Sequence, residues 1–199
     1  MSNMQDVEIS DRRTTIIDAA FKVFLAYGFR RTTMADIADA AGISRPALYL
    51  EFKNKADIYR AGFLAMLDST FRNVDEALQG DSPLLERLVA ALNAGVVIPM
   101  RRVQQSPHGA ELFEVKQEIA GDLGQDWNAV MEKSLERALS VDAESGGLDL
   151  AGRDLTAADL ARLIVSSVEG IKKRKSDWHQ AEADIGRIVE LMVQPLVMR

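Results

Sequence analysis

The chain has 199 residues, of which 47% are hydrophobic and 27% are charged, with no cysteine and only two histidines. This length fits one compact domain or a small domain joined to a larger one. The lack of cysteine excludes disulfides, thiolate metal sites and cysteine nucleophiles, and two histidines exclude a histidine-rich metal site. The longest nearly apolar stretch, Leu88 to Met100, is shorter than the roughly 20 residues that cross a bilayer. We expect a cytoplasmic protein without a metal or other cofactor.

Charge is distributed unevenly along the chain. The 24 basic and 30 acidic residues give a net charge of −6. Residues 10–60 carry a net charge of +3, so the remainder carries −9. A mildly basic N-terminal region on an acidic body is compatible with a local DNA-binding surface. The imbalance does not by itself identify a DNA-binding protein.

Hydrophobic residues recur at helical spacing along the whole chain, and no alternating pattern predicts a strand. The pattern therefore predicts an all-α fold of about nine helices. The expected helices cover residues 11–26, 33–41, 44–52, 54–78, 84–100, 111–143 with a break near 121–124, 156–175 and 180–197. Pro99 lacks a backbone donor and is expected to kink or end the helix that contains it.

Two short helices joined by a tight turn at Gly42 are typical of a helix-turn-helix unit. Thr33, followed three places later by Asp36, is expected to cap the first helix, and Ser44 is expected to cap the second. The first turn of the second helix contains Arg45, Pro46 and Ala47. A helix that enters the major groove by its N-terminal turn needs small or polar residues there. The spacing alone is not specific, because many helical hairpins contain a glycine between the helices.

The residue string is more specific than the spacing. Residues 32–55 read TTMADIADAAGISRPALYLEFKNK, which strongly resembles the DNA-binding head of the TetR family of bacterial repressors. The upstream helix, with Ala19, Ala20 and Phe24 before Gly28, resembles the family too. The resemblance covers residues 10–63, the expected helix-turn-helix domain. Residues 64–199 match only in layout, which implies a helical domain for effector binding and dimerisation.

The resemblance implies that the second short helix enters the major groove and that residues around it contact DNA. Arg45 is the candidate for reading a guanine edge, and Tyr49 and Lys55 match family residues that bind phosphate. Taken alone, Lys55 would be an ordinary surface lysine. The complete expected set is Arg31, Thr33, Ser44, Arg45, Pro46, Ala47, Tyr49, Lys53 and Lys55. Further phosphate contacts are open to Arg12, Arg13 and Arg30.

Glu51 departs from the family pattern, because relatives often carry histidine or an aromatic residue there. A carboxylate beside the DNA backbone would be repelled unless it paired with Lys53 or Lys55. We therefore expect no DNA contact from Glu51.

Nine apolar residues of the central helices are candidates for lining an effector cavity. They are Phe63, Met66, Leu67, Phe71, Val97, Met100, Phe113, Trp127 and Met131. Each of them could equally belong to an ordinary packed core, which is the commoner location for such residues. The basic run at 172–175 is expected to be a solvated helix end, which is favoured at the negative end of the helix dipole.

The last two predicted helices carry apolar seams that match the family's four-helix dimer arrangement. The seam residues are Leu160, Leu163, Ile164, Val168, Ile171, Ile185, Ile188, Val189, Met192 and Leu196. One such pair of helices has more apolar surface than a single core face needs. We therefore expect a homodimer.

These features predict a ligand-responsive transcriptional regulator. It would be a repressor that binds a near-palindromic DNA operator as a homodimer and is released by a small-molecule effector. An enzyme is not expected, because the chain has neither a nucleophile-elbow motif nor a glycine-rich phosphate loop. The alternative is a helical enzyme or ligand carrier that would show no salt-dependent DNA affinity. A regulator with a closed core and no effector is a further alternative.

Overall fold

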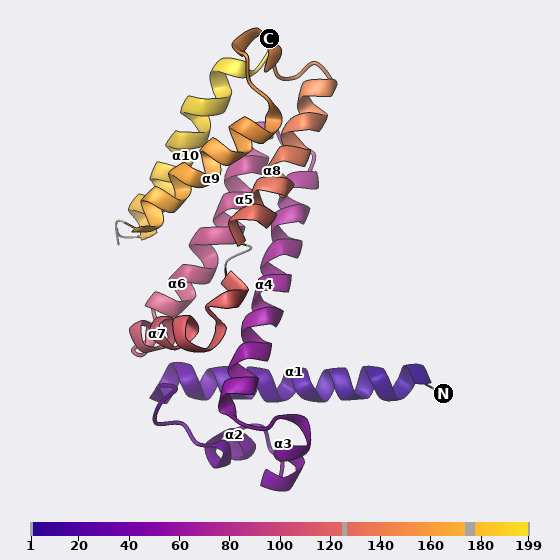
Figure 1. Cartoon of the computed structure of the whole chain (residues 1–199), viewed down its shortest axis with the longest axis vertical. Helices are drawn as coiled ribbons and strands as arrows, with labels where there is room; N and C mark the ends of the chain where they lie inside the picture. Colours follow the sequence, from indigo (N-terminus) through magenta and orange to yellow (C-terminus); the bar gives the residue numbers. More distant parts are fainter. Residues whose placement is uncertain (1, 125–126, 174–177, 199) are drawn as a thin grey trace. The chain divides into compact units, whose positions relative to one another are not determined.

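Figure 1 shows the computed structural model of the chain, which describes residues 2–124, 127–173 and 178–198. Over these residues every regular element is a helix, apart from one antiparallel bridge between Leu148 and Val197. The predicted all-α fold is confirmed. None of the described helices is long and apolar enough to cross a membrane.

The α-helices are α1 (Ser2–Tyr27), α2 (Met34–Ala40), α3 (Arg45–Glu51), α4 (Lys55–Gln79), α5 (Leu84–Leu92), α6 (Ile98–Gln104), α7 (Gly109–Ala120), α8 (Trp127–Glu144), α9 (Ala157–Lys173) and α10 (Trp178–Val193). A π-helical turn, Asn93–Val97, joins α5 to α6 without a break. Short 3-10 turns cover Asp122–Gly124, Ala151–Arg153 and Gln194–Leu196. With α5 and α6 counted as one continuous helix, the described residues form nine helices, in agreement with the prediction.

The chain divides into two compact units. The first unit contains residues 1–68 and 102–124, and the second contains residues 69–101 and 125–199. The division expected from the sequence placed everything after residue 63 in the second domain. In the structure, residues 102–124 pack within the first unit, because α7 contributes buried side chains to its core.

The first unit has an aromatic core. In Figure 1, α2 and α3 lie below α1, and α7 lies above it. The rings of Phe21, Phe24, Phe29 and Tyr59 contact one another, with centroids 5.1–6.1 Å apart. Gly62 lets α4 approach α1 closely, because a Cβ at this position would collide with the Phe21 ring. These contacts set where α1 and α4 cross.

The second unit has an aliphatic core to which α5, α8, α9 and α10 contribute leucine, isoleucine, valine and alanine side chains. Arg87 ties the loop after α4 to α8. Its guanidinium donates to the carbonyls of Leu78 and Ser82 at 2.8 and 3.0 Å and pairs with Asp142 at 2.6 Å. Apart from such polar contacts, the core of this unit is held by non-directional packing of apolar side chains.

Pro99 does not end its helix, which was one of the two outcomes expected, but the helix is distorted just before it. The helix continues through Pro99 to Gln104, and the preceding turn widens so that the Ile98 N–H donates to the Asn93 carbonyl. A π turn of this kind accommodates a local change in the hydrogen-bond ladder, such as the donor that proline lacks.

Two helix ends also differ from the prediction. The first helix begins at Ser2 rather than at residue 11, because neither proline nor glycine interrupts residues 2–10. The basic run at 172–175 lies partly outside the described residues. Within the described part, Lys172 pairs with Glu169 and lies 4.3 Å from the centroid of the Trp127 ring, so it is not simply solvated.

Candidate nucleic-acid interface

The start of α2 is fixed by the predicted capping box. The Asp36 N–H donates to the Thr33 hydroxyl at 3.3 Å, and the Thr33 N–H donates to the Asp36 carboxylate at 2.8 Å. The backbone N–H and the hydroxyl of Thr33 both donate to the Asp36 carboxylate and hold its pKa below the usual value, and the nearby charge of Arg45 contributes in the same direction. Two helix-end donors are thereby satisfied locally.

The turn between α2 and α3 depends on glycine. Gly42 has a φ of +67°, in the left-handed region, with open space where a Cβ would lie. Glycine is therefore required for its backbone conformation and not for packing. The turn is closed by hydrogen bonds from Gly42 N to Asp39 O at 3.2 Å and from Ile43 N to Ala38 O at 3.0 Å. Ser44 then caps α3 by accepting from the Ala47 N–H at 3.3 Å.

One face of α3 is buried and the other is open. Leu48 is fully buried with Ile37 and Ala38 in the core of the first unit. Arg45 and Pro46 are exposed in the first turn of α3. Tyr49 is 55% exposed and Leu50 is 85% exposed. Ala47 is partly buried. The N-terminal edge of α3 is therefore open to solvent within its own unit.

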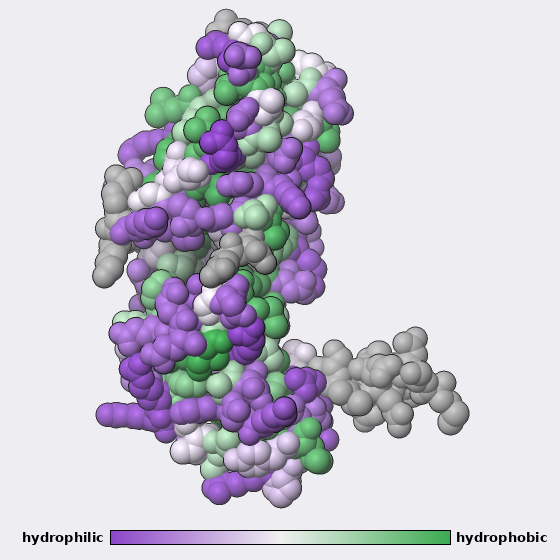
Figure 2. Space-filling model, viewed as in Figure 1, coloured by the Kyte–Doolittle hydropathy of each residue, from purple (hydrophilic) through white to green (hydrophobic). Residues whose placement is uncertain are grey.

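Leu50 is missing from the expected contact set. It follows Pro46 by four residues, so both lie on the same face of a helix, and this spacing could have identified it. Large exposed hydrophobic residues are scattered over the described surface. Hydrophilic side chains cover most of the face seen in Figure 2. Leu50 stands out among the exposed hydrophobic residues because it lies on the open face of α3.

The basic residues near α3 differ in whether their side chains already form ion pairs within the protein. Arg31 and Lys53 are exposed and form no ion pair among the described residues. Arg30 instead pairs with Glu114 at 3.3 Å and with Glu118 at 3.2 Å, both on α7. Its expected phosphate contact therefore competes with two carboxylates.

The ammonium group of Lys55 is turned toward its own chain. Its Nζ donates to the carbonyls of Phe29 at 2.7 Å, Arg30 at 3.1 Å and Thr32 at 2.8 Å. It also lies 4.6 Å from the centroid of the Phe29 ring. Burial lowers the pKa of Lys55, and the negative charge of Glu111 opposes that shift. Lys55 is only partly accessible at the place where a phosphate contact was expected.

Glu51 is paired with arginines of α1 and not with Lys53 or Lys55. Its carboxylate lies 3.9 Å from Arg12 Nε and 3.7 Å from Arg13, both on α1. Arg13 also donates to the Glu51 backbone carbonyl at 2.7 Å and stacks 4.2 Å from the centroid of the Phe52 ring. These contacts join the end of α3 to α1. Arg13 is correspondingly less available for phosphate.

Helix α7 is bound to α4 by polar contacts within the first unit. The Tyr59 hydroxyl donates to the Leu112 carbonyl at 2.7 Å, and burial raises the pKa of Tyr59 to about 12. Arg60 donates to the Ile119 carbonyl at 2.9 Å and to Asp122 at 2.7 Å. The sequence pattern did not predict these contacts, which join residues more than fifty positions apart.

The nine residues expected to line an effector cavity are divided between the two units. The first unit contains Phe63, Met66, Leu67 and Phe113, and the second contains Phe71, Val97, Met100, Trp127 and Met131. Phe113 is 49% exposed. Within the second unit the packing is close around Gly95, since a Cβ there would collide with Met131.

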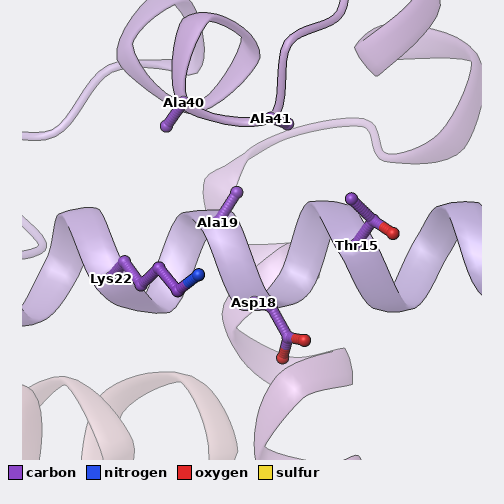
Figure 3. A pocket seen from close by; sticks show the side chains of 6 residues that line it. All are labelled: Thr15, Asp18, Ala19, Lys22, Ala40 and Ala41. Carbon is purple, nitrogen blue, oxygen red and sulfur yellow. The ribbon is translucent and has the colours of Figure 1, made fainter.

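A surface hollow lies elsewhere, between α1 and α2. It is lined by Thr15, Asp18, Ala19, Lys22, Ala40 and Ala41. Figure 3 shows Ala19 pointing toward Ala40 and Ala41, whereas Asp18 points away from them. None of the nine expected cavity residues lines this hollow. In the described part of the chain, no group of three or more acidic or histidine side chains could hold a metal ion.

Most of the ten residues expected at a dimer interface are buried within the subunit itself. Seven are buried in the core of the second unit: Leu160, Ile164, Val168, Ile171, Ile185, Val189 and Leu196. Their burial corrects the expected position of the seam. Ile188 and Met192 pack partly against that core, and Leu163 is 42% exposed. Leu191 on α10, which was not among the expected residues, is 75% exposed.

Comparison with known proteins identifies relatives of both the head and the whole chain. The family model described as bacterial regulatory proteins of the tetR family matches residues 16–61. The HTH-type transcriptional regulator YhgD of Bacillus subtilis (strain 168) is 27% identical over 162 residues, 79% of this chain and 83% of YhgD. The HTH-type transcriptional repressor KstR2 of Rhodococcus jostii (strain RHA1) is 31% identical over 137 residues, 64% of this chain and 67% of KstR2.

Solved structures share the fold over nearly the whole chain. A transcriptional regulator from Cytophaga hutchinsonii aligns with a TM-score of 0.76 and 15% identity, over 92% of this chain and 97% of the other. SmeT in complex with triclosan aligns with a TM-score of 0.60 and 20% identity, over 94% and 92%. SmeT is the repressor of a multidrug efflux pump of Stenotrophomonas maltophilia. Together with the capped helix pair and the matched relatives, this agreement shows that the chain belongs to the TetR family of helix-turn-helix transcriptional regulators.

Proposed function

We propose that this regulator is a repressor that binds a near-palindromic operator as a homodimer and releases it when a small-molecule effector binds. The observation that carries the proposal is the open N-terminal edge of α3, whose opposite face is fixed in the core by Leu48. A helix presented in this way can enter the major groove by its first turn. The related regulators discussed above, including the repressor KstR2, support this role.

The proposed DNA contacts fall into two groups. Arg45 reads a base pair, because its planar group can donate two hydrogen bonds to a guanine edge. Pro46 and Ala47 let the backbone of α3 approach the bases. Phosphate contacts hold the head in register without reading sequence. The proposed phosphate-binding residues are Arg31, Thr33, Ser44, Tyr49 and Lys53, all of which are exposed.

The proposed dimer uses apolar residues that remain outside the core of the second unit. Leu163 on α9 and Leu191 on α10 are the most exposed of these, and Ile188 and Met192 lie partly at the surface. A two-fold interface uses the same patch on both subunits. Two α3 helices would then read half-sites about 34 Å apart, or a multiple of that distance.

An effector site is proposed in the second unit. Two buried polar atoms of this unit, Asn93 Oδ1 and Trp178 Nε1, have no hydrogen-bond partner among the described residues. Buried polar groups normally have partners, so an effector that reached either atom would supply the hydrogen bond that this atom lacks. The complex of SmeT with triclosan supports small-molecule binding by this fold. The effector shifts the equilibrium only through its different affinities for two states.

Selection of bound sequences from random duplex DNA tests the proposal. We expect enrichment of a near-palindrome, with an affinity that falls steeply as salt rises. The selection is then repeated with candidate effectors that raise the melting temperature of the protein. An effector that abolishes enrichment supports release. Absence of salt-dependent DNA affinity would point instead to a helical carrier or enzyme, and enrichment without any stabilising effector would indicate a regulator with a closed core.

A further inference from the structure

The loop that precedes α2 accepts hydrogen bonds from all three side-chain donors of one lysine. Residues 28–32 form this loop, and Lys55 Nζ donates to three of its carbonyls, those of Phe29, Arg30 and Thr32. An ammonium group has three N–H donors. All three are used at 2.7–3.1 Å, so none remains for a phosphate oxygen.

A carboxylate of α7 holds the same loop through a backbone N–H rather than through its carbonyls. Glu111 accepts a hydrogen bond from the Arg30 backbone N–H at 2.7 Å. Its other oxygen lies against Gly28, where a Cβ would collide with it and where φ is +86°. Within the loop, the buried Thr32 hydroxyl donates to the Gly28 carbonyl at 2.6 Å. The backbone of the loop is thus held by two charged side chains: an ammonium group binds its carbonyls and a carboxylate binds one of its N–H groups.

The loop leads directly into the helix-turn-helix. Thr33, the cap of α2, follows Thr32 in the chain, and the exposed Arg31 lies inside the loop. Ile37 of α2 and Leu48 of α3 belong to the same buried cluster. A displacement of the loop would therefore move the start of α2 and, through this packing, the open edge of α3.

We propose that Lys55 and Glu111 are positioning residues that clamp residues 28–32 and so hold the helix-turn-helix in its DNA-binding arrangement, and that Lys55 makes no phosphate contact. The proposal rests on the proposed DNA binding and departs from the role that the family resemblance implies for Lys55. It also gives Glu111, a negative residue, a positive effect on affinity for a negatively charged ligand.

Replacement of Lys55 by arginine separates the clamp from a phosphate contact. Arginine keeps the charge and binds phosphate well, but its planar fork cannot direct its donors to three converging carbonyls. For Lys55→Arg we expect operator affinity to fall about tenfold, as for the loss of one or two charged hydrogen bonds, with the slope of log affinity against log salt unchanged. Unchanged affinity would overturn the clamp.

Neutral variants of two neighbouring lysines provide the matched comparison. Lys53→Met should flatten the salt slope by about 0.9, as expected for one phosphate contact. Lys55→Met should lower affinity for the selected operator while leaving the slope as in the wild type. A slope reduced equally by both variants would assign Lys55 to phosphate and overturn the proposal.

Removal of the Glu111 carboxylate changes DNA affinity in opposite directions under the clamp and under a purely electrostatic effect. If only long-range charge mattered, removal of any carboxylate from α7 would strengthen DNA binding. For Glu111→Ala we expect weaker operator binding, by about fivefold to tenfold. Glu114→Ala on the same helix is the control, because Glu114 is exposed and pairs with the Arg30 side chain rather than with the loop backbone. This variant should bind DNA as well as, or better than, the wild type.

Protection of backbone amides separates positioning from loss of folding. Hydrogen exchange of the free full-length protein should show faster exchange of the Arg30 amide in Glu111→Ala and in Lys55→Arg, with unchanged protection in α9. Tighter DNA binding by Glu111→Ala, or unchanged Arg30 exchange in both variants, would overturn the proposal. Absence of DNA binding by the wild type would instead reject the proposed function, and the exchange experiment would still test the clamp.

Discussion

The two units of this regulator are stabilised by different kinds of contact. The first unit combines an aromatic cluster with directional polar contacts, such as the Arg13–Glu51 and Lys55–Phe29 hydrogen bonds. The core of the second unit contains mainly aliphatic side chains. Directional contacts fix one geometry, which DNA recognition requires, whereas aliphatic packing tolerates repacking. The difference suits a rigid head and a second unit whose core can adapt to the effector proposed for it.

The largest expected effect is in the aromatic core. Phe24→Ala removes a fully buried ring that contacts Phe21, Phe29 and Tyr59, and should destabilise the first unit by about 3–5 kcal/mol. Ile164→Leu in the aliphatic core keeps side-chain volume and should cost less than about 1.5 kcal/mol. Urea unfolding followed by circular dichroism measures both changes. Phe24→Leu is the change that matches Ile164→Leu, and equal losses for these two variants would remove the proposed contrast between the units.

The next effect is on DNA binding through α3. Arg45→Ala should weaken operator binding by about 1–3 kcal/mol and relax discrimination at one base pair in each half-site. Fluorescence anisotropy with single-base operator variants measures this loss. Lys53→Met is the comparison, since a phosphate contact affects all sequences alike. An equal loss on operator and random DNA would make Arg45 a backbone contact.

A smaller effect is expected where α1 meets the end of α3. Arg13→Ala removes the hydrogen bond to the Glu51 carbonyl and the stacking on Phe52, and should reduce the free energy of unfolding by about 1 kcal/mol. Glu51→Gln removes only the negative charge of a pair that is partly exposed, and should be nearly neutral. Thermal unfolding compares them. If Glu51→Gln proved the more harmful change, the ion pair rather than the directional contacts would hold α3.

The smallest expected effect is a pH dependence of the capping box. The pKa of Asp36 is lowered when the protein is folded, so its contribution to stability is present above the unfolded value near 3.8 and is lost as the pH falls through the folded value. Asp36→Asn should therefore reduce the acid dependence of stability below about pH 4. Unfolding curves recorded about every half pH unit, from about pH 2.5 to about pH 6, measure this difference. An identical acid profile for both proteins would contradict it.

Local sequence signals predicted the helix caps and the turn of the helix-turn-helix. The caps at Thr33 and Ser44 and the glycine turn depend on neighbours within three or four positions, so they can be read along the chain. Glu51 and Lys55 could not be assigned in this way. Their partners, such as Arg13 and Phe29, lie 38 and 26 positions away, and only the fold brings them together.

The apolar seams of α9 and α10 could not be assigned from the sequence for a different reason. An apolar residue such as Ile164 has the same helical spacing whether it faces its own core or a second subunit. The pattern located the helices but could not assign the partner of each face. Burial in the structure separates Ile164 and Val189 from the exposed Leu163 and Leu191.

The assignment of residues 102–124 to the first unit bears on attempts to isolate the DNA-reading part. A fragment cut after residue 68 would lack α7, leaving the Tyr59 hydroxyl without the Leu112 carbonyl and Arg30 without its acidic partners. Its apolar interior would also lose Leu112 and Val115. The first unit therefore cannot be transferred to another protein as one continuous segment. Such a transfer requires both residues 1–68 and residues 102–124, with a linker in place of the intervening thirty or so residues.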